Sequence, residues 1–174
     1  MSRAGARFHG KYRGTVADNL DPLQQGRLRL KVPNVLGKET STWALPCVPI
    51  AGAPGSASGL FALPDLEARV WVEFEDGEMD HPIWVGCFWD ENQVTPMTLA
   101  TPSPVTAITF QTRQHNGLTI SDAPGAGGGI VIESAGGATL IVNDSGITID
   151  NGAGATIKLQ GGTVSINGDA LEVT

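Results

Sequence analysis

Apolar and polar residues alternate along five separate stretches in the first half of the chain, and each stretch is bounded by Gly, Pro, Asn or Asp. The clearest is GRLRLKVP at residues 26–33, where aliphatic and basic residues alternate. A period of two is typical of a half-buried strand. The other stretches, also rich in Val, Ile or aromatic residues, lie at residues 10–19, 41–50, 68–76 and 81–89. Five strands with no amphipathic helix between them predict a small β-barrel.

A second pattern begins after residue 106, where two aliphatic residues repeatedly flank one central residue. Seven pairs recur, with Gly, Asn or Asp in most of the gaps between them. Because alternate side chains of a strand point to opposite faces, both members of a pair share one face and the central Thr, Lys, Ser or Glu takes the other. Self-similarity at this spacing predicts a solenoid or β-helix of short strands. The pairs are Leu118/Ile120, Ile130/Ile132, Leu140/Val142, Ile147/Ile149, Ile157/Leu159, Val164/Ile166 and Leu171/Val173.

The fourteen paired side chains need a covering layer that one chain does not provide. Each contributes about 1.5–3 kcal/mol when it is buried. A two-layer sandwich needs strands of about five or six residues in regular hairpins, and a single-chain β-helix needs roughly twenty residues per coil. Three identical chains that each contribute one face would bury the pairs on a threefold axis. The sequence therefore predicts an intertwined trimeric β-helix, a β-prism needle whose backbone hydrogen bonds run across the three chains.

The composition changes between the two patterns, which predicts a domain boundary. All four tryptophans and the single tyrosine precede residue 90, whereas no aromatic residue follows Phe110. Residues 95–106 contain three prolines, which favours a stiff linker. The predicted organisation of this all-β chain is an N-terminal segment at 1–9, a barrel domain at 10–94, the linker at 95–106 and the needle at 107–174.

Charge is distributed unevenly along the chain. Residues 1–38 carry eight basic and two acidic side chains, whereas residues 39–174 carry three basic and sixteen acidic ones. A basic start on an acidic body could attract nucleic acid. The basic residues of GRLRLKVP alternate with aliphatic ones, however, so we interpret them as the solvated face of a strand. We therefore predict no nucleic-acid partner.

The chemistry-bearing residues form no catalytic or metal-binding pattern. Cys47 and Cys87 lie in apolar surroundings and are predicted to be reduced core residues, with a disulfide or a metal pair as alternatives. His9, His81 and His115 are far apart, so we predict no metal site. The carboxylates of VEFEDGEMDHP lie at a strand end and turn, where they are expected to be solvated. We predict neither an enzyme activity nor a cofactor, and no apolar run reaches the roughly 20 residues of a membrane span.

Three stretches of the first half match a known family in order. They are GKYRGTVADNLDPLQQGRLRLKVP at 10–33, WALPCVPIAG at 43–52 and LPDLEARVWVEFEDGEMDHPIWVGCFW at 63–89. With these stretches the barrel half resembles the OB-fold domain of phage baseplate assembly protein V and of the VgrG-type spike proteins of type VI secretion systems. The second half resembles, in its composition, the trimeric β-helix of the same proteins.

This resemblance implies a homotrimeric central spike in a contractile tail baseplate. The particle would be a phage, a tailocin or a related injection system, assembled in the bacterial cytoplasm. The needle would pierce a membrane, so its contact with the target cell membrane would be transient. The fold implied is an N-terminal OB-fold barrel followed by the intertwined β-helix.

The resemblance also implies two protein partners. VgrG-type proteins fuse a hub domain ahead of the barrel, and fewer than ten residues precede the first predicted strand here. The hub is therefore expected to be a separate polypeptide, contacted by Arg3, Arg7, Lys11 and Arg13, with a solvated tail as the alternative for these basic residues. The open end of a β-prism exposes unpaired strand edges. A separate PAAR-type tip protein is therefore expected to cap Leu171, Glu172, Val173 and Thr174.

Two other functions are compatible with the sequence. One is an OB-fold module that binds nucleic acid or sugar and carries a trimerising β-helical tail. Salt-dependent binding to single strands would identify it. The other is a short receptor-binding tailspike or polysaccharide depolymerase, which would need a larger β-helix with a carboxylate groove.

Overall fold

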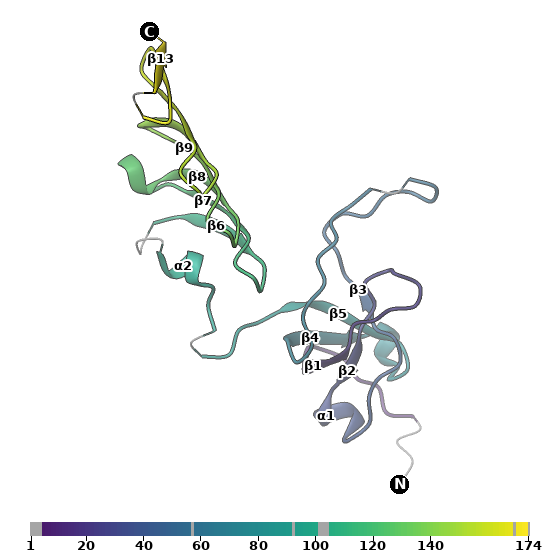
Figure 1. Ribbon diagram of the computed structural model, residues 1–174. Coiled ribbons are helices and arrows are strands. Elements are labelled where there is room, and N and C mark those ends of the chain that lie inside the picture. Colours follow the sequence, from purple (N-terminus) through teal and green to yellow (C-terminus); the bar gives the residue numbers. More distant parts are fainter. Residues whose placement is uncertain (1–4, 57, 92, 101–104, 169, 174) are drawn as a thin grey trace. The chain divides into compact units, whose positions relative to one another are not determined.

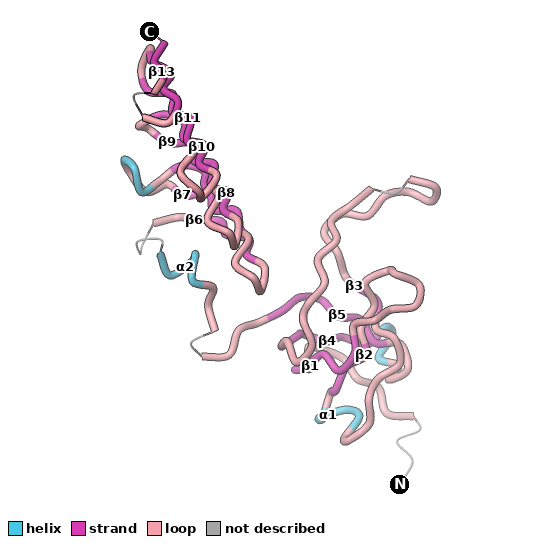
Figure 2. The backbone as a smooth tube through the Cα atoms, in the orientation of Figure 1, coloured by secondary structure: helices cyan, strands magenta, loops and turns pink. Residues whose placement is uncertain are grey.

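Strands dominate the computed structural model, which describes residues 5–56, 58–91, 93–100, 105–168 and 170–173 (Figures 1 and 2). The chain divides into two compact units, Met1–Asn92 and Gln93–Thr174. Helical segments in the described residues are short: α1 (Pro33–Leu36), α2 (Pro96–Ala100) and the 3-10 turns η1 (Glu75–Gly77) and η2 (Gly125–Gly127). The all-β prediction is therefore confirmed.

The N-terminal unit is a curled five-stranded sheet with the order β2-β1-β4-β5-β3. Neighbouring strands are antiparallel except β3 and β5, which are parallel. Bridges from Leu28 to Ala44 and from Lys31 to Thr40 connect the strand at one end of this order to the segment before β3. These bridges curl the sheet toward closure, as an OB-fold requires. The strands are β1 (Tyr12–Asp18), β2 (Arg29–Lys31), β3 (Leu45–Pro46), β4 (Arg69–Phe74) and β5 (Pro82–Cys87).

The hydrophobic core lies inside this curled sheet. Leu28, Leu30 and Val32 are completely buried, which confirms the half-buried strand predicted from GRLRLKVP. The indole of Trp84 closes the core and donates its N–H to the carbonyl oxygen of Gly26 at 3.0 Å. Every hydrophobic side chain that is buried within the described part of the chain belongs to this unit. Besides those four, the core contains Val16, Val35, Ala44, Val70, Val72 and Phe74.

The prediction that the two cysteines are core residues is wrong, because Cys47 and Cys87 are both exposed and free. Cys47 begins the long connection between β3 and β4, whose apolar residues also lie largely at the surface. Cys87 ends β5 on the side of that strand that faces solvent. Apolar neighbours in the sequence therefore did not indicate burial at either position.

The C-terminal unit is a single eight-stranded sheet in which every strand pairs with its neighbours in the sequence. All of these pairs are antiparallel, so the sheet is a meander that continues from β6 to β13 (Figure 1). The strands are β6 (Ala107–Gln111), β7 (Gly117–Ser121), β8 (Gly129–Glu133), β9 (Thr139–Asn143), β10 (Gly146–Asp150), β11 (Thr156–Gln160), β12 (Thr163–Ile166) and β13 (Leu171–Val173).

The meander corrects the expectation that backbone hydrogen bonds run across three chains. Interior strands such as β10 are hydrogen-bonded on both edges by strands of the same chain. The physical reason is the shortness of the turns, since a few residues can only return the chain beside itself in the antiparallel direction. The predicted repeat of short strands is present, but the backbone hydrogen bonds between its strands lie within one chain.

Asparagine and glycine shape the turns between these strands. The Asn143 side-chain oxygen accepts the N–H of Ser145 at 2.9 Å, and the Asn151 side-chain oxygen accepts those of Ala153 and Ala155. Gly146 begins β10 with a φ of 130°, where an added Cβ would collide with the carbonyl oxygen of Leu159. These local requirements explain why Gly and Asn fill the gaps between the aliphatic pairs.

Helix α2 lies inside the segment predicted to be a stiff Pro-rich linker. The Met97 N–H donates to the Gln111 side-chain oxygen at 3.1 Å, so this helix is attached to the strand β6 that follows it. The domain limits at residues 94/95 and 106/107 stay predictions. No helix in the described ranges is both long enough and apolar enough to span a membrane.

Candidate functional site

Two continuous ladders of apolar side chains run across all eight strands on one face of the C-terminal sheet. In each ladder, every residue is the direct cross-strand partner of the next. We call these residues the apolar face. The first ladder is Ile108, Ile120, Ile130, Val142, Ile147, Leu159 and Val164, and Val173 is the register partner of Val164 in the last strand. The second ladder is Phe110, Leu118, Ile132, Leu140, Ile149, Ile157, Ile166 and Leu171.

The structure brings thirteen of the fourteen predicted core residues together on this face, and the fourteenth, Val173, is paired with Val164 in the backbone register. The sequence prediction missed two members, Ile108 and Phe110, which extend both ladders onto β6. Their spacing around Thr109 follows the same pattern as the other pairs. The aromatic residue and the adjacent Pro-rich segment set this pair apart from the aliphatic repeat.

The apolar face is uncovered in a single chain. Among its members whose side chains are described, none is buried, and most are classed with the exposed large hydrophobic residues of the molecule. Monomeric soluble proteins rarely expose contiguous apolar surface on this scale, and such surfaces mark interaction sites. The face therefore requires an apolar partner.

The opposite face carries a third ladder made of the central residues of each strand. It combines hydroxyl, charged and aliphatic side chains, because Val131 and Ile141 occupy two of its positions. The central Thr, Lys, Ser and Glu residues named from the sequence therefore share this face with two aliphatic residues. Its members are Thr109, Thr119, Val131, Ile141, Thr148, Lys158 and Ser165, and Glu172 is the register partner of Ser165 in the last strand.

The predicted tip-protein contact lies at one edge of the sheet. Strand β13 pairs with β12 alone among the described strands, so one side of its backbone has no ladder partner. Leu171 ends one apolar ladder and is exposed, and Thr174 lies outside the described residues. An unpaired edge strand is a ready site for pairing with another chain.

The basic residues predicted to contact a hub already have partners within the N-terminal unit. Arg7 forms an ion pair with Glu78, and Lys11 forms one with Glu73 at 2.6 Å. The Arg13 guanidinium lies over the rings of Trp71 and Phe88, at 5.2 and 4.8 Å from their centroids. All three side chains remain exposed, and Arg3 lies outside the described residues. A hub contact stays a prediction and would have to form beside these interactions.

Two carboxylates of the β1–β2 loop, Asp18 and Asp21, are hydrogen-bonded within the fold. Asp18 accepts the N–H of Leu20, and Asp21 forms an ion pair with Arg27 at 2.6 Å. In the described part of the chain, no group of three or more His, Cys, Asp or Glu side chains is placed to hold a metal ion. The apolar face is therefore the strongest candidate for function.

Two family models match the chain, one for each unit. The type VI secretion system/phage-baseplate injector OB domain matches residues 12–89. The phage baseplate V C-terminal trimerisation domain matches residues 107–172, the segment that carries the apolar face. No curated protein matches the sequence.

Proposed function

This chain belongs to the phage baseplate V family of spike-type structural proteins, and we propose that three copies form the central needle of a contractile tail baseplate. The observation that carries the proposal is the apolar face, which is continuous over eight strands and uncovered in one chain. The matching trimerisation domain supports three copies rather than another number.

In the proposed needle, the three sheets turn their apolar faces toward a common axis. Branched aliphatic residues suit this interior because they are compact and have stiff side chains. Each chain supplies one wall, and the hydrogen bonds of each wall run along the length of the sheet. With about 4.8 Å between neighbouring strands, eight strands make a wall of about 34 Å. A short sheet whose neighbouring strands are hydrogen-bonded to one another is suited to a needle that transmits force.

The role is structural rather than enzymatic. The family models describe an injector OB domain and a trimerisation domain, and two of the acidic residues at the end of β4 and in the turn after it, Glu73 and Glu78, form ion pairs with Lys11 and Arg7. The protein would be assembled in the bacterial cytoplasm and would reside in the tail baseplate of the particle.

The finer contacts of the spike are part of the same proposal. A baseplate hub would bind the OB domain, and a PAAR-type tip would pair with the edge strand β13. The tip would lead the needle through the target cell membrane during contraction. The unpaired edge of β13 and the exposed Leu171 support a partner at this end.

Electron microscopy of purified tail particles tests the proposal. An epitope inserted into the chain is expected to label the centre of the baseplate, within density of threefold symmetry. Particles from cells that lack the chain should lose this density. Label at peripheral, sixfold positions, or intact central density without the chain, would contradict a central spike.

A further inference from the structure

The long connection between β3 and β4 forms an uncharged arm that projects from the barrel. We define the arm as residues 47–64, and Figure 1 shows it extending away from the sheet. Its two legs are paired by backbone hydrogen bonds between Gly52 and Ser58 at 2.6 Å and between Leu60 and Ile50 at 3.1 Å. No charged residue occurs between residues 40 and 64. The described residues of the arm therefore form an extension of apolar character.

Large hydrophobic side chains are exposed both on the arm and on the loop between β1 and β2. Leu20 is 82% exposed in that loop, and Phe61 is 67% exposed at the base of the arm. Exposed side chains of this size are normal when scattered singly, but a cluster marks an interaction site. The six residues concerned, which we call the apolar end, are Leu20, Leu23, Ile50, Leu60, Phe61 and Leu63.

Two contacts join the loop to the arm. The Asn19 side-chain amide donates to the carbonyl oxygen of Pro64 at 2.9 Å. The Phe61 ring lies over Gly26, where an added Cβ would be 3.2 Å from the ring. These two contacts hold the β1–β2 loop against the base of the arm.

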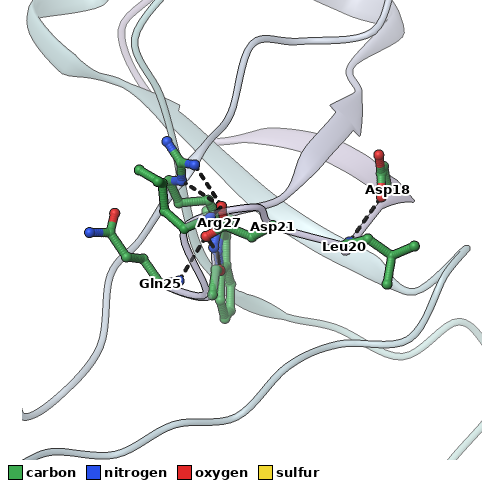
Figure 3. Close-up of polar contacts among 8 residues, drawn as sticks. Asp18, Leu20, Asp21, Gln25 and Arg27 are labelled. Atoms are coloured by element: carbon green, nitrogen blue, oxygen red, sulfur yellow. Dashed lines mark hydrogen bonds and ion pairs between the residues drawn. The ribbon is translucent and has the colours of Figure 1, made fainter.

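A buried carboxylate orders the β1–β2 loop. The Asp21 side chain is 3% exposed. It accepts the backbone N–H groups of Leu23, Gln25 and Arg27 at 2.8–3.2 Å. Figure 3 shows the Arg27 guanidinium donating to the same carboxylate, through Nε at 3.0 Å and Nη2 at 2.6 Å. Leu20 and Leu23 are therefore held out to solvent by a fixed loop rather than by a flexible one.

Arg27 also connects this loop to the segment that precedes β3. Its guanidinium lies 5.5 Å from the centroid of the Trp43 ring. A surface that is ordered before it binds loses less conformational entropy on association. The apolar end therefore has the preorganisation expected of a binding surface.

We propose that the apolar end of each OB domain packs against the OB domain of a second copy of this chain. This inference rests on the proposed trimer, in which the C-terminal sheets hold three OB domains at a high effective concentration. Uncharged apolar surfaces are typical of permanent homo-oligomeric interfaces, whereas interfaces that form and dissociate are more polar. In a threefold ring such a contact is head-to-tail, so the apolar end meets a different surface of its neighbour.

Photo-cross-linking of the full-length protein tests this contact. Photo-reactive benzoylphenylalanine would replace Leu60 on the arm in one protein and Leu23 on the loop in another. In a matched control it would replace Lys38, an exposed residue after α1. The proteins are irradiated at nanomolar concentration, where separate trimers do not meet, and native mass is measured on the same samples. Denaturing gels then report covalent dimers.

The inference predicts covalent dimers from Leu60 and Leu23 in roughly tenfold higher yield than from Lys38, because the tethered neighbour is always within reach. Adding Leu20→Glu to the Leu60 protein should lower that yield several-fold while the trimer mass is kept. Yields equal to the Lys38 control in an intact trimer would overturn the inference and leave the proposed function standing. Adducts that form only with a co-expressed hub would also overturn it, and a monomeric mass would contradict both proposals.

Discussion

Ile149 on β10 lies directly opposite Ile157 on β11, and both side chains project from the apolar face. The neighbour of Ile149 on the other side is Leu140 of β9, so the residue sits at the middle of a continuous ladder. In a single chain these side chains are exposed to solvent, so a charged residue would be tolerated at either position. In a trimer whose apolar faces meet, they would be buried, and a charge there would have no partner.

Ile149→Asp is therefore expected to abolish the trimer, because three unpaired carboxylates would be buried near one axis. Native mass spectrometry or light scattering measures the result. Thr148→Asp is the matched control, since Thr148 points to the opposite face and lies across from Lys158. The control should remain trimeric. Equal effects of the two substitutions would show that the apolar face is not the interface.

Gly146→Ala is expected to destabilise the C-terminal sheet by more than about 1 kcal/mol, since alanine does not tolerate a positive φ without strain. The added Cβ would also collide with the backbone of Leu159 on the neighbouring strand. Thermal unfolding measures the change. Gly162→Ala in the β11–β12 turn is the control, because its Cβ would enter open space. A loss of stability at Gly162 as large as that at Gly146 would contradict this register.

Asp21→Asn is expected to lower the stability of the OB domain at neutral pH. The Arg27 guanidinium outweighs the opposing effect of burial and holds the pKa of Asp21 well below its usual range, and three backbone N–H groups lower that pKa further. The ordinary carboxyl pKa is about 3.9, so ionised Asp21 stabilises the fold above this value. Its contribution is lost as the pH falls below about 4 toward the lower folded-state pKa.

Denaturant unfolding followed by tryptophan fluorescence measures this pH dependence, because all four tryptophans lie in the OB domain. The difference between the wild-type protein and Asp21→Asn should shrink as the pH falls below about 4. Glu73→Gln removes the exposed pair with Lys11 and should change stability by about 0–1 kcal/mol. A constant difference for Asp21→Asn down to the most acid pH would exclude the ion pair as its cause.

Trp84→Phe is expected to cost about 1–3 kcal/mol, because the carbonyl oxygen of Gly26 would lose its buried donor. Trp84 is 7% exposed, whereas Trp89 is 64% exposed. Trp89→Phe should therefore be nearly neutral in the same denaturant experiment. Comparable losses at the two positions would contradict the placement of Trp84 in the core.

The sequence pattern was sufficient for the position of every strand in the OB domain. Alternation around Leu28, Leu30 and Val32 is a local property, and the buried face follows directly from it. The same reasoning placed the fourteen aliphatic residues on one face of the second unit. Both predictions depend only on the alternation of side chains along a strand. This alternation is the same whichever strands pair with it.

Pairing and exposure were harder to predict. The repeat suggested coils of a solenoid, but the turns at residues such as Asn143 and Asn151 return each strand beside the previous one. The extension of both ladders to Ile108 and Phe110 was missed, because an aromatic residue interrupts the aliphatic pattern. Which strands pair depends on contacts between residues of different strands, and a pattern along the sequence does not show these contacts.

The apolar end shows another limit of sequence reasoning. An uncharged stretch that includes Cys47, Ile50 and Phe61 suggests burial, yet the chain exposes it. The composition of a segment indicates that it favours an apolar environment. It does not indicate whether the same chain or a partner provides that environment. The Asp21–Arg27 pair was likewise missed, because Arg27 was assigned to the solvated face of a strand.

Native mass measurement of the purified full-length protein tests the central claim most directly. At micromolar concentration we predict a single species of three times the 18.1 kDa chain mass, with its apolar faces buried. The trimer should persist on dilution, because a face of this extent cannot be left in water. A monomer at micromolar concentration would contradict the trimer and the spike function that depends on it.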